Sequence, residues 1–291
     1  MRCQNWLSTR IHKCDNDVSS KAVESVQIMT SSQSRSPRHI LSLSGGKDST
    51  ALAIFMRDRI PEMEYVFCDT GEELPETYEY LDRLEAYLGK PIVRLNPDRP
   101  FSHYLDIYRG VLPDSRTRWC TRMLKIKPFE KYVGDQEAIS YIAIRADEPH
   151  RKGYISTKPN LKAVYPFIDE GLIKRDVFKL LEESGLGIPE YYQWRSRSGC
   201  YFCFYQQRRE WVGLLERHPE LYEKAKTFEK FDTVTGQRFT WSATESLEEL
   251  QVPERVEQIK ESQLRIKEAS SSNLIDLLDE EDEASCLVCH L

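Results

Sequence analysis

The chain has 291 residues, 40% of them hydrophobic, which is enough for one large domain or for one domain with a small appendage. No apolar run approaches the ~20 residues of a membrane span, which argues against a membrane partner. The formal net charge of −6 is misleading, because six of the 47 acidic residues lie in 269–291, which has no Lys or Arg. The rest of the chain balances 41 acidic residues against 41 basic ones, so an anionic substrate is not excluded.

The beginning of the chain differs in composition from its middle. Residues 1–37 are rich in serine and show no sustained period, so we expect them to be disordered. They hold no signal-peptide core, which predicts a cytoplasmic protein. In that compartment the eight cysteines are expected to bind metal or to take part in redox chemistry rather than to form disulfides.

A phosphate-binding loop is predicted at residues 44–49, which read Ser-Gly-Gly-Lys-Asp-Ser. The apolar run before it alternates like a strand, and the run after it, 50–56, reads as a helix that Pro61 ends. Adjacent glycines let the backbone approach a ligand, and a helix start directs free N–H groups at the same point. The lysine adds a positive charge. The glycine spacing is not that of the common phosphate loop, and a plain glycine turn with a chance lysine is the alternative.

Further strands and helices follow this loop in alternation. Residues 65–68 form a predicted strand that ends in Asp69 and Thr70, and a helix stopped by Gly89 leads to a third strand at 92–95. Alternation at this spacing predicts parallel pairing in a doubly wound α/β sheet. Because ligands bind outside the carboxyl ends of such strands, the two polar residues are candidate nucleotide contacts.

A basic segment follows a long connection at 96–119. Six Lys and Arg residues lie between Arg116 and Lys131 with few acids among them, whereas a solvated helix would interleave the two signs. We therefore expect a basic surface that faces phosphates. Cys120 lies inside this segment, where neighbouring positive charge favours the thiolate.

Two more strands are predicted in the second half of the sheet. Residues 139–144 form the fourth strand, which is followed by Arg145 and, a few residues later, by Arg151. A short fifth strand is predicted at 164–167, and 174–184 reads as an amphipathic helix. Both arginines again follow a strand end, the position at which ligands bind.

Cys200 and Cys203 form a C-x-x-C motif, the spacing at which two thiolates bind one metal ion or cluster. With Cys120 as a third ligand, the set matches a [4Fe–4S] cluster with one free iron, or a zinc site completed by another group. A redox dithiol is the third interpretation, although the strand–helix context of a thioredoxin is absent.

The remaining sequence reads as a helical extension and an acidic tail. Residues 204–231 have the pattern of two helices broken by a His-Pro pair, 238–241 are extended, and 253–268 form a charged helix. Cys286 and Cys289 are interpreted as incidental thiols of a disordered tail, with a mobile sulfur carrier or an extra metal site as the alternative. The predicted parts are a leader (1–37), a main domain (38–232), a helical extension (233–268) and the tail (269–291).

Taken in order, these motifs resemble those of the phosphoadenosine phosphosulfate (PAPS) reductase-like branch of the PP-loop ATP pyrophosphatases. The resemblance covers about residues 38–232 and implies a five-stranded, mostly parallel α/β sheet of the adenine nucleotide alpha hydrolase type, with a C-terminal helical extension. The five motifs that carry it are Ser44–Ser49, Asp69-Thr70-Gly71-Glu72 with Pro75-Glu76-Thr77, Cys120–Pro128, Arg145-Ala146-Asp147-Glu148 with Arg151, and Gly199-Cys200 with Cys203.

Three departures from the reductases matter. PAPS reductases and adenosine phosphosulfate (APS) reductases usually carry an S-F-G loop, because their nucleotide has no β,γ-pyrophosphate, whereas residues 44–49 match the members that cleave ATP to AMP and pyrophosphate. Cluster-bearing reductases have two adjacent cysteines where this chain has Trp119 and Cys120, and the C-terminal Cys-Gly motif is missing. The chain is therefore more similar to the ATP pyrophosphatases of DNA phosphorothioation and tRNA thiolation.

For such an enzyme the resemblance implies ATP and Mg²⁺ as ligands. Lys47 and the loop amides would hold the leaving pyrophosphate, Asp48 and Asp69 would position metal or nucleotide, and the arginines would bind acceptor or phosphates. The catalytic residues implied are Lys47, Asp48 and Arg145. The nucleotide-binding residues implied are Ser44, Gly45, Gly46, Lys47, Asp48, Ser49, Asp69, Thr70 and Arg151.

The resemblance also implies a sulfur transfer. A [4Fe–4S] cluster on Cys120, Cys200 and Cys203 would support transfer of sulfur, from a donor such as a cysteine desulfurase, to an adenylated acceptor, with DNA or tRNA as the expected class. Two alternatives remain open at this point: a PAPS or APS reductase of sulfate assimilation, and a nucleotide-binding interaction module with a structural zinc.

Overall fold

The described part of the chain begins just before the first predicted strand. The computed structural model describes residues 36–151, 156, 158–231 and 236–269. The predicted leader lies outside the described residues except for its last two residues, and the acidic tail with Cys286 and Cys289 lies outside them except for its first residue. Of the helices in the described ranges, none has both the length and the apolar composition that a bilayer crossing requires.

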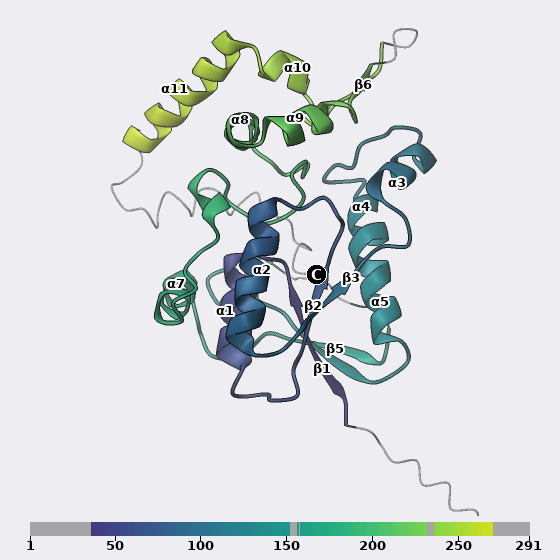
Figure 1. Cartoon of the computed structure of the whole chain (residues 1–291), viewed down its shortest axis with the longest axis vertical. Coiled ribbons are helices and arrows are strands. Elements are labelled where there is room, and N and C mark those ends of the chain that lie inside the picture. Colours follow the sequence, from purple (N-terminus) through teal and green to yellow (C-terminus); the bar gives the residue numbers. More distant parts are fainter. Residues whose placement is uncertain (1–35, 152–155, 157, 232–235, 270–291) are drawn as a thin grey trace, which may run out of the picture. The chain divides into compact units, whose positions relative to one another are not determined.

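Five parallel strands form the central sheet in the order β3-β2-β1-β4-β5 (Figure 1). This order confirms the predicted doubly wound sheet. The direction in which strands are added reverses between β1 and β4, so the carboxyl ends of these two strands flank the place where such sheets bind ligands. The strands are β1 (Arg38–Leu43), β2 (Glu64–Cys68), β3 (Ile92–Leu95), β4 (Ala138–Tyr141) and β5 (Leu161–Val164).

Alternation along β1 sends its side chains into two separate cores. Leu41 and Leu43 pack into the core on one face, and Ile40 packs with Phe129 and Val133 on the other. Each such side chain stabilises the fold by ~1.5–3 kcal/mol when fully buried, so a slip of one residue in register would be costly. Helices cover the two faces as Figure 1 shows: α1 (Lys47–Met56), α2 (Pro75–Leu88) and α7 (Lys174–Glu183) on the first, and α5 (Lys127–Val133) on the second.

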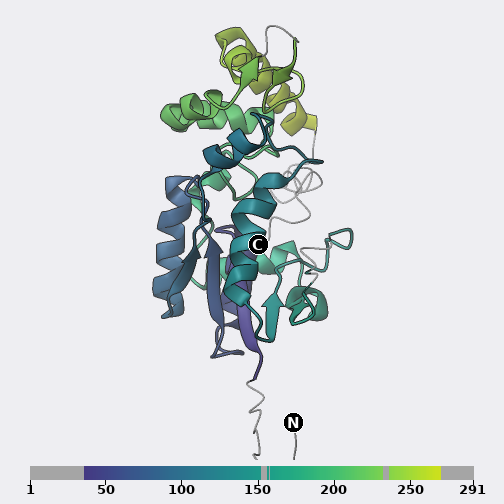
Figure 2. The same cartoon turned by 90° about the vertical axis from the view of Figure 1, so that its right-hand side faces the viewer.

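A further core, rich in aromatic residues, joins the C-terminal helices to α3 (Phe101–Ile107). The ring of Phe101 lies 5.1 Å from that of Trp119, 4.3 Å from that of Phe202 and 6.2 Å from that of Trp241, measured between ring centroids. In Figure 2 the C-terminal elements, coloured green to yellow, lie beyond the carboxyl ends of the strands. They are α8 (Arg208–Arg217), α9 (Pro219–Lys226), β6 (Lys230–Phe231), β7 (Arg238–Phe239), α10 (Leu247–Leu250) and α11 (Pro253–Ala269).

Some predicted boundaries are wrong. The fourth strand ends at Tyr141 rather than at residue 144, and the fifth strand spans Leu161–Val164 rather than 164–167. The cause of the second error is Pro166, which begins the short helix α6 (Pro166–Asp169). A proline has no N–H for a sheet ladder, and its fixed φ suits the first turn of a helix. The two helices at the His-Pro pair and the helix from residue 253 are confirmed.

The basic segment forms one helical column on the second face of the sheet, at the front of Figure 2. It starts as α4 (Trp119–Thr121) and continues through a π-helical turn, η1 (Arg122–Ile126), into α5. At the junction the N–H of Lys127 donates to the carbonyl oxygen of Arg122, five residues earlier. Turns of this kind occur often at functional sites.

Candidate active site

The loop between β1 and α1 has a shape that requires its two glycines. Gly45 has a φ of +73°, and a Cβ there would lie 2.6 Å from Thr77 Cγ2. Gly46 is the N-cap of α1, and a Cβ there would lie 2.8 Å from Ser198 Oγ. The predicted phosphate loop is therefore a tight turn that leads into the N-terminus of a ten-residue helix, where the N–H groups of the first turn and the helix dipole favour an anion.

Two adjacent tyrosines from a distant segment hold this loop. The hydroxyl of Tyr191 donates to the carbonyl oxygen of Gly45 at 2.7 Å, and the N–H of Lys47 donates to the hydroxyl oxygen of Tyr192 at 3.2 Å. Both belong to η2 (Glu190–Gln193), a 3₁₀ turn. Burial raises the pKa of Tyr191 well above its usual value, so this phenol stays protonated as a donor. The sequence analysis missed both residues.

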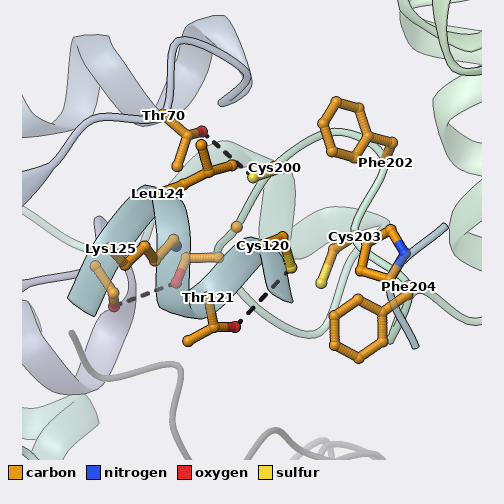
Figure 3. A pocket seen from close by; sticks show the side chains of 13 residues that line it. Thr70, Cys120, Thr121, Leu124, Lys125, Cys200, Phe202, Cys203 and Phe204 are labelled. Atoms are coloured by element: carbon orange, nitrogen blue, oxygen red, sulfur yellow. Dashed lines mark hydrogen bonds between the residues drawn. The ribbon is translucent and has the colours of Figure 1, made fainter. Parts of the chain in front are cut away.

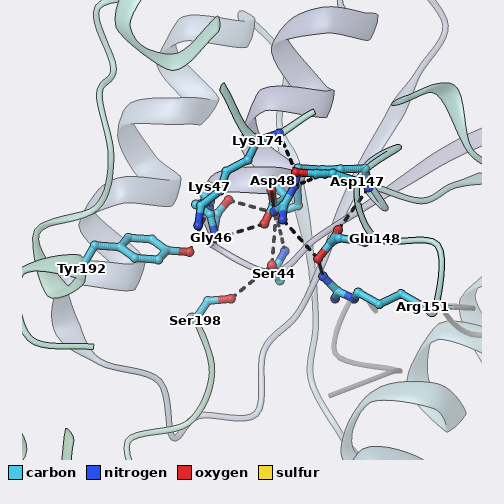
Figure 4. Close-up of polar contacts among 12 residues, drawn as sticks. Ser44, Gly46, Lys47, Asp48, Asp147, Glu148, Arg151, Lys174, Tyr192 and Ser198 are labelled. Atoms are coloured by element: carbon cyan, nitrogen blue, oxygen red, sulfur yellow. Dashed lines mark hydrogen bonds and ion pairs between the residues drawn. The ribbon is translucent and has the colours of Figure 1, made fainter. Parts of the chain in front are cut away.

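Serine hydroxyls link the loop internally and to the C-x-x-C segment. The Oγ atoms of Ser44 and Ser49 lie 3.1 Å apart, and Ser49 Oγ donates to the carbonyl oxygen of Gly46 at 3.2 Å. Ser198 Oγ donates to Ser44 Oγ at 3.2 Å (Figure 4). Ser198 was not predicted, and the only signal for it is its place two residues before Cys200.

A buried ion-pair network connects α1 to the turn after β4. Arg145 Nη1 lies 2.8 Å from Asp48 Oδ1, and its Nε lies 2.9 Å from Asp147 Oδ1. Asp48 Oδ2 also lies 3.4 Å from Lys47 Nζ (Figure 4). Burial opposes the charge of Arg145, but Asp48 and Glu148 outweigh this effect and raise the pKa of its guanidinium. The guanidinium therefore stays charged, and it orients Asp48 at the first turn of α1.

Two more buried cations complete this network. Arg151 pairs with Glu148 through Nη1 and Oε1. Lys174, the first residue of α7, is only 3% exposed, and its backbone N–H donates to Asp147 Oδ2 at 3.1 Å. Sequence analysis predicted Arg151 but not Lys174. The cluster has four cations and three carboxylates, so its net charge is +1, which suits a polyphosphate. The cations are Lys47, Arg145, Arg151 and Lys174, and the carboxylates are Asp48, Asp147 and Glu148.

The turn after β2 is held by its own polar residues. Asp69 Oδ1 accepts from the N–H of Gly71 at 2.9 Å and from the hydroxyl of Tyr78 at 2.8 Å. The hydroxyl of Thr70 donates to Glu73 Oε1 at 2.8 Å. The two predicted residues thus lie where the sequence analysis placed them, at the carboxyl end of the strand next to β1.

All three predicted sulfur ligands line one cavity. Cys120 reaches it from α4, and Cys200 and Cys203 reach it from the segment before α8 (Figure 3). Ser44 of the loop and Thr70 of the neighbouring turn line the same cavity. The fold therefore brings the thiols together beside the phosphate loop, although Cys120 is far from the other two in sequence.

Cys200 is tied to the turn after β2. Its Sγ lies 3.4 Å from Thr70 Oγ1 and 3.8 Å from Glu73 Oε1, and residues 73 and 200 form an isolated antiparallel β-bridge. The N–H of Tyr201 donates to the carbonyl oxygen of Glu72 at 2.9 Å. Burial first, and then the charge of Glu73, raises the pKa of the Cys200 thiol well above its usual value. A positively charged partner is therefore needed before this sulfur becomes a thiolate ligand.

The thiols have the chemistry of an iron–sulfur or zinc donor set, but they do not form a closed ligand shell. Within the described ranges, no group of three His, Cys, Asp or Glu side chains is arranged to hold a metal ion. A metal or cluster would thus require the three side chains to converge. Cys68 is separate from them: it is buried in the sheet, its Sγ donates to the carbonyl oxygen of Lys125 at 3.6 Å, and burial raises its pKa to about 12.

Comparison with known proteins gives one family match. Residues 38–205 match the phosphoadenosine phosphosulfate reductase domain. A crystal structure of phosphoadenylyl-sulfate reductase from Candida auris, in a phosphate complex, aligns with a TM-score of 0.46 at 14% identity, over 57% of this chain and 83% of that one.

Sequence relatives come from phages, archaea and bacteria. An uncharacterized protein of Escherichia phage 186 is 27% identical over 262 residues, covering 69% of this chain and 77% of the relative. An uncharacterized protein of Methanocaldococcus jannaschii is 26% identical over 195 residues, covering 63% of this chain but only 45% of the relative. An adenosine 5′-phosphosulfate reductase of Staphylococcus haemolyticus is 28% identical over 111 residues, covering 38% of this chain and 45% of that enzyme.

Proposed function

The chain belongs to the phosphoadenosine phosphosulfate reductase domain family, and we propose that within it this protein is an ATP pyrophosphatase that adenylates an acceptor. The observation that carries the proposal is the turn at Gly45 and Gly46. It leads directly into α1, has Lys47 buried beside it, and lies at the point where the strand order reverses. A pyrophosphate group is the anion that uses backbone amides, a lysine and a helix N-terminus together.

Mg²⁺ would shield the phosphate charges, and Asp69 fits it better than Asp48 does. Asp48 has one oxygen on Arg145 and the other near Lys47. Asp69 uses only Oδ1, and the structure describes no partner for its second oxygen within the described ranges. Oxygen ligands of this kind are those that Mg²⁺ prefers. We therefore assign Asp69 to metal and nucleotide, and Asp48 to orientation of Lys47 and Arg145.

The proposed chemistry is a substitution at the α-phosphate of ATP. An acceptor oxygen forms a new bond to the α-phosphorus, and the bond to the bridging oxygen of the β-phosphate breaks. Pyrophosphate leaves with the electron pair, and the acceptor becomes an adenylate. Lys47 and the amides at the start of α1 would stabilise charge on the leaving group, so catalysis is mainly positioning and electrostatic stabilisation.

Sulfur transfer is the second proposed step, and the thiol cavity is the feature that supports it. A sulfur nucleophile would displace AMP from the adenylated acceptor, forming a bond from sulfur to the acceptor while the bond to the AMP oxygen breaks. Cys120, Cys200 and Cys203 line the cavity next to the loop. A [4Fe–4S] cluster held by these thiols would supply a free iron for sulfur, with zinc as the alternative metal. A cysteine desulfurase is the proposed sulfur donor.

A reductase of PAPS or APS is the second candidate, favoured by the partial similarity to an adenosine 5′-phosphosulfate reductase. The two functions differ in product. The test is incubation of the purified protein with Mg²⁺ and ATP labelled at the α-phosphate, with total RNA or DNA as acceptor. We expect pyrophosphate and labelled adenylyl groups in equal amounts, the latter attached to the acceptor or released from it as AMP. Release of sulfite from PAPS or APS, with no ATP cleavage under any of these conditions, would replace the proposal by the reductase.

A further inference from the structure

The π-helical turn changes which basic residues share a face of the helix. In a regular α-helix, residues five apart point in different directions, because 3.6 residues complete a turn. In η1 the N–H of Lys127 bonds to Arg122, so these two residues lie one turn apart along the axis. Lys131 follows one α-helical turn later, at the i+4 position. From this spacing we infer that Arg122, Lys127 and Lys131 lie on the same side of the column, and they are called the row below.

Exposure shows that this row faces solvent. Arg122, Lys127 and Lys131 are all exposed, and the side chain of Lys131 is 75% exposed. The structure describes no ion pair for Arg122 or Lys127 within the described ranges. Lys125, in the same turn, is instead half-buried and lines the thiol cavity. From Arg122 onward, the basic segment thus has one inward lysine and an outward row.

A groove runs beside this row at the carboxyl end of β3. Its volume is about 360 Å³. Its cations are Arg94, Lys127 and Lys131, and its one carboxylate, Asp98, lies 2.9 Å from Lys131 Nζ. Asn96 adds an amide side chain to the lining, and two aromatic side chains, Tyr104 and Tyr132, also line the groove.

We propose that this groove and the row beside it bind a single strand of RNA along its phosphodiester backbone. The row's cations match phosphates, and a cationic groove with aromatic walls is the usual form of a single-strand site. Asp98 and Asn96 supply hydrogen-bond acceptors. Phosphates have no proton to donate to them, whereas the 2′-hydroxyl of ribose can donate one, so these two residues favour RNA over DNA. RNA binding at this groove does not depend on the proposed function. Only the further statement that the bound strand is the acceptor for adenylation rests on it.

The placement connects the strand to the reaction site. Lys125 and Cys120, on the same helical column as the row, line the cavity next to the phosphate loop. Met123 lines the groove and the next two residues of the helix line the cavity, so a strand in the groove lies against the helix that forms one wall of the cavity. Backbone contacts of this kind position a substrate without reading its sequence, so we expect little dependence on base order.

The test is RNA binding by fluorescence anisotropy, without ATP, using a labelled single-stranded RNA of about 16 nucleotides. The variant carries Arg122→Gln, Lys127→Gln and Lys131→Gln. A matched control carries Arg59→Gln, Lys162→Gln and Lys179→Gln, which removes the same charge from exposed positions elsewhere. We expect the first variant to raise Kd about tenfold and to reduce the slope of log Kd against log salt by about 2, since each phosphate contact contributes ~0.7. The control should bind like the unmodified protein.

Three outcomes would overturn the inference: unchanged binding by the first variant, equal weakening by the control, or equal affinity for a DNA strand of the same sequence. Because no ATP is present, the result is independent of the proposed chemistry. Row-dependent RNA binding without any ATP cleavage would refute the pyrophosphatase and leave the RNA site standing. ATP cleavage with unchanged RNA binding would do the reverse.

Discussion

The hydroxyl oxygen of Tyr192 lies 3.2 Å from the backbone nitrogen of Lys47 and accepts its hydrogen bond. This N–H belongs to the first residue of α1, where an anion would bind. Lys47 Nζ also lies 5.4 Å from the centroid of the Tyr192 ring. The phenol therefore occupies a donor that a bound phosphate would use, and it contacts the side chain that would neutralise the phosphate.

The first prediction is that Tyr192→Phe binds ATP more tightly. In the unmodified protein, ATP must displace the Tyr192 hydroxyl from the Lys47 N–H, and that hydrogen bond is worth about 1 kcal/mol net. The variant has no such bond to displace, so the N–H is available to ATP. We expect the Kd for ATP, measured by calorimetry, to fall about fivefold. A Kd that rises instead would mean that the phenol contacts the nucleotide directly.

The second prediction concerns Lys47→Ala. Its ammonium is placed to meet charge that develops on pyrophosphate, and loss of one such contact commonly costs ~10²–10³ in rate. We expect a decrease of this size in the rate of AMP formation, with an unchanged circular dichroism spectrum. Lys179→Ala, at an exposed position on α7, is the control. Full activity in the Lys47 variant would remove the loop from the mechanism.

The third prediction uses the contact between the loop and Ser198. A methyl group at Gly46 would lie 2.8 Å from Ser198 Oγ and 3.1 Å from the Tyr192 hydroxyl. We expect Gly46→Ala to lower ATP turnover by roughly 5- to 150-fold, which corresponds to the cost of about 1–3 kcal/mol that overpacking of this kind imposes. Adding Ser198→Gly should restore part of the turnover. No restoration would show that the close approach to Ser198 is not what limits the loop.

The fourth prediction concerns the thiol cavity. Protein purified without oxygen should contain about four irons per chain and absorb visible light, as a [4Fe–4S] cluster does. Replacing Cys120, Cys200 or Cys203 by Ser should remove the iron, whereas Cys68→Ser should keep it, because Cys68 lies outside the cavity. Stoichiometric zinc without iron would favour the structural site and remove the support for sulfur transfer.

The fifth prediction concerns the pH dependence of stability. Arg38 donates to Glu64 through Nε at 2.8 Å and Nη2 at 2.5 Å, and Tyr132 donates to it at 2.6 Å. Hydrogen bonds from Arg38 hold the pKa of Glu64 below its usual value. This stabilisation is present above the unfolded pKa of about 4.3 and is lost as the pH falls through the lower folded value.

Glu64→Gln should therefore lower the free energy of unfolding at pH 7 by about 1 kcal/mol, a figure reduced for partial exposure. The difference from the unmodified protein should shrink below pH 4. Urea unfolding at several pH values measures both. A difference that stays constant down to pH 3 would contradict the assignment to charge.

The strand order and the loop were predictable because they depend on local patterns. A strand, a Gly-Gly turn and a helix follow each other within 38–56. The polar residues that follow three of the strands meet at one edge, because parallel strands all have their carboxyl ends at the same edge of the sheet. Tyr191 and Tyr192 were not predictable, since they reach the loop from a segment 145 residues or more away in the chain. The π turn was equally hidden, because no residue pattern distinguishes it from an α-helix.

The bridge between residues 73 and 200 has a thermodynamic consequence. It joins the turn that carries Asp69 and Thr70 to the one that carries Cys200, so a shift of one turn alone would break these contacts. If occupancy of the thiols changes the affinity for ATP by some factor, ATP must change the affinity of the thiols for their ligand by the same factor. Loading of the sulfur site and loading of the nucleotide site are then coupled by one free energy, and the order in which the ligands arrive leaves the final complex the same.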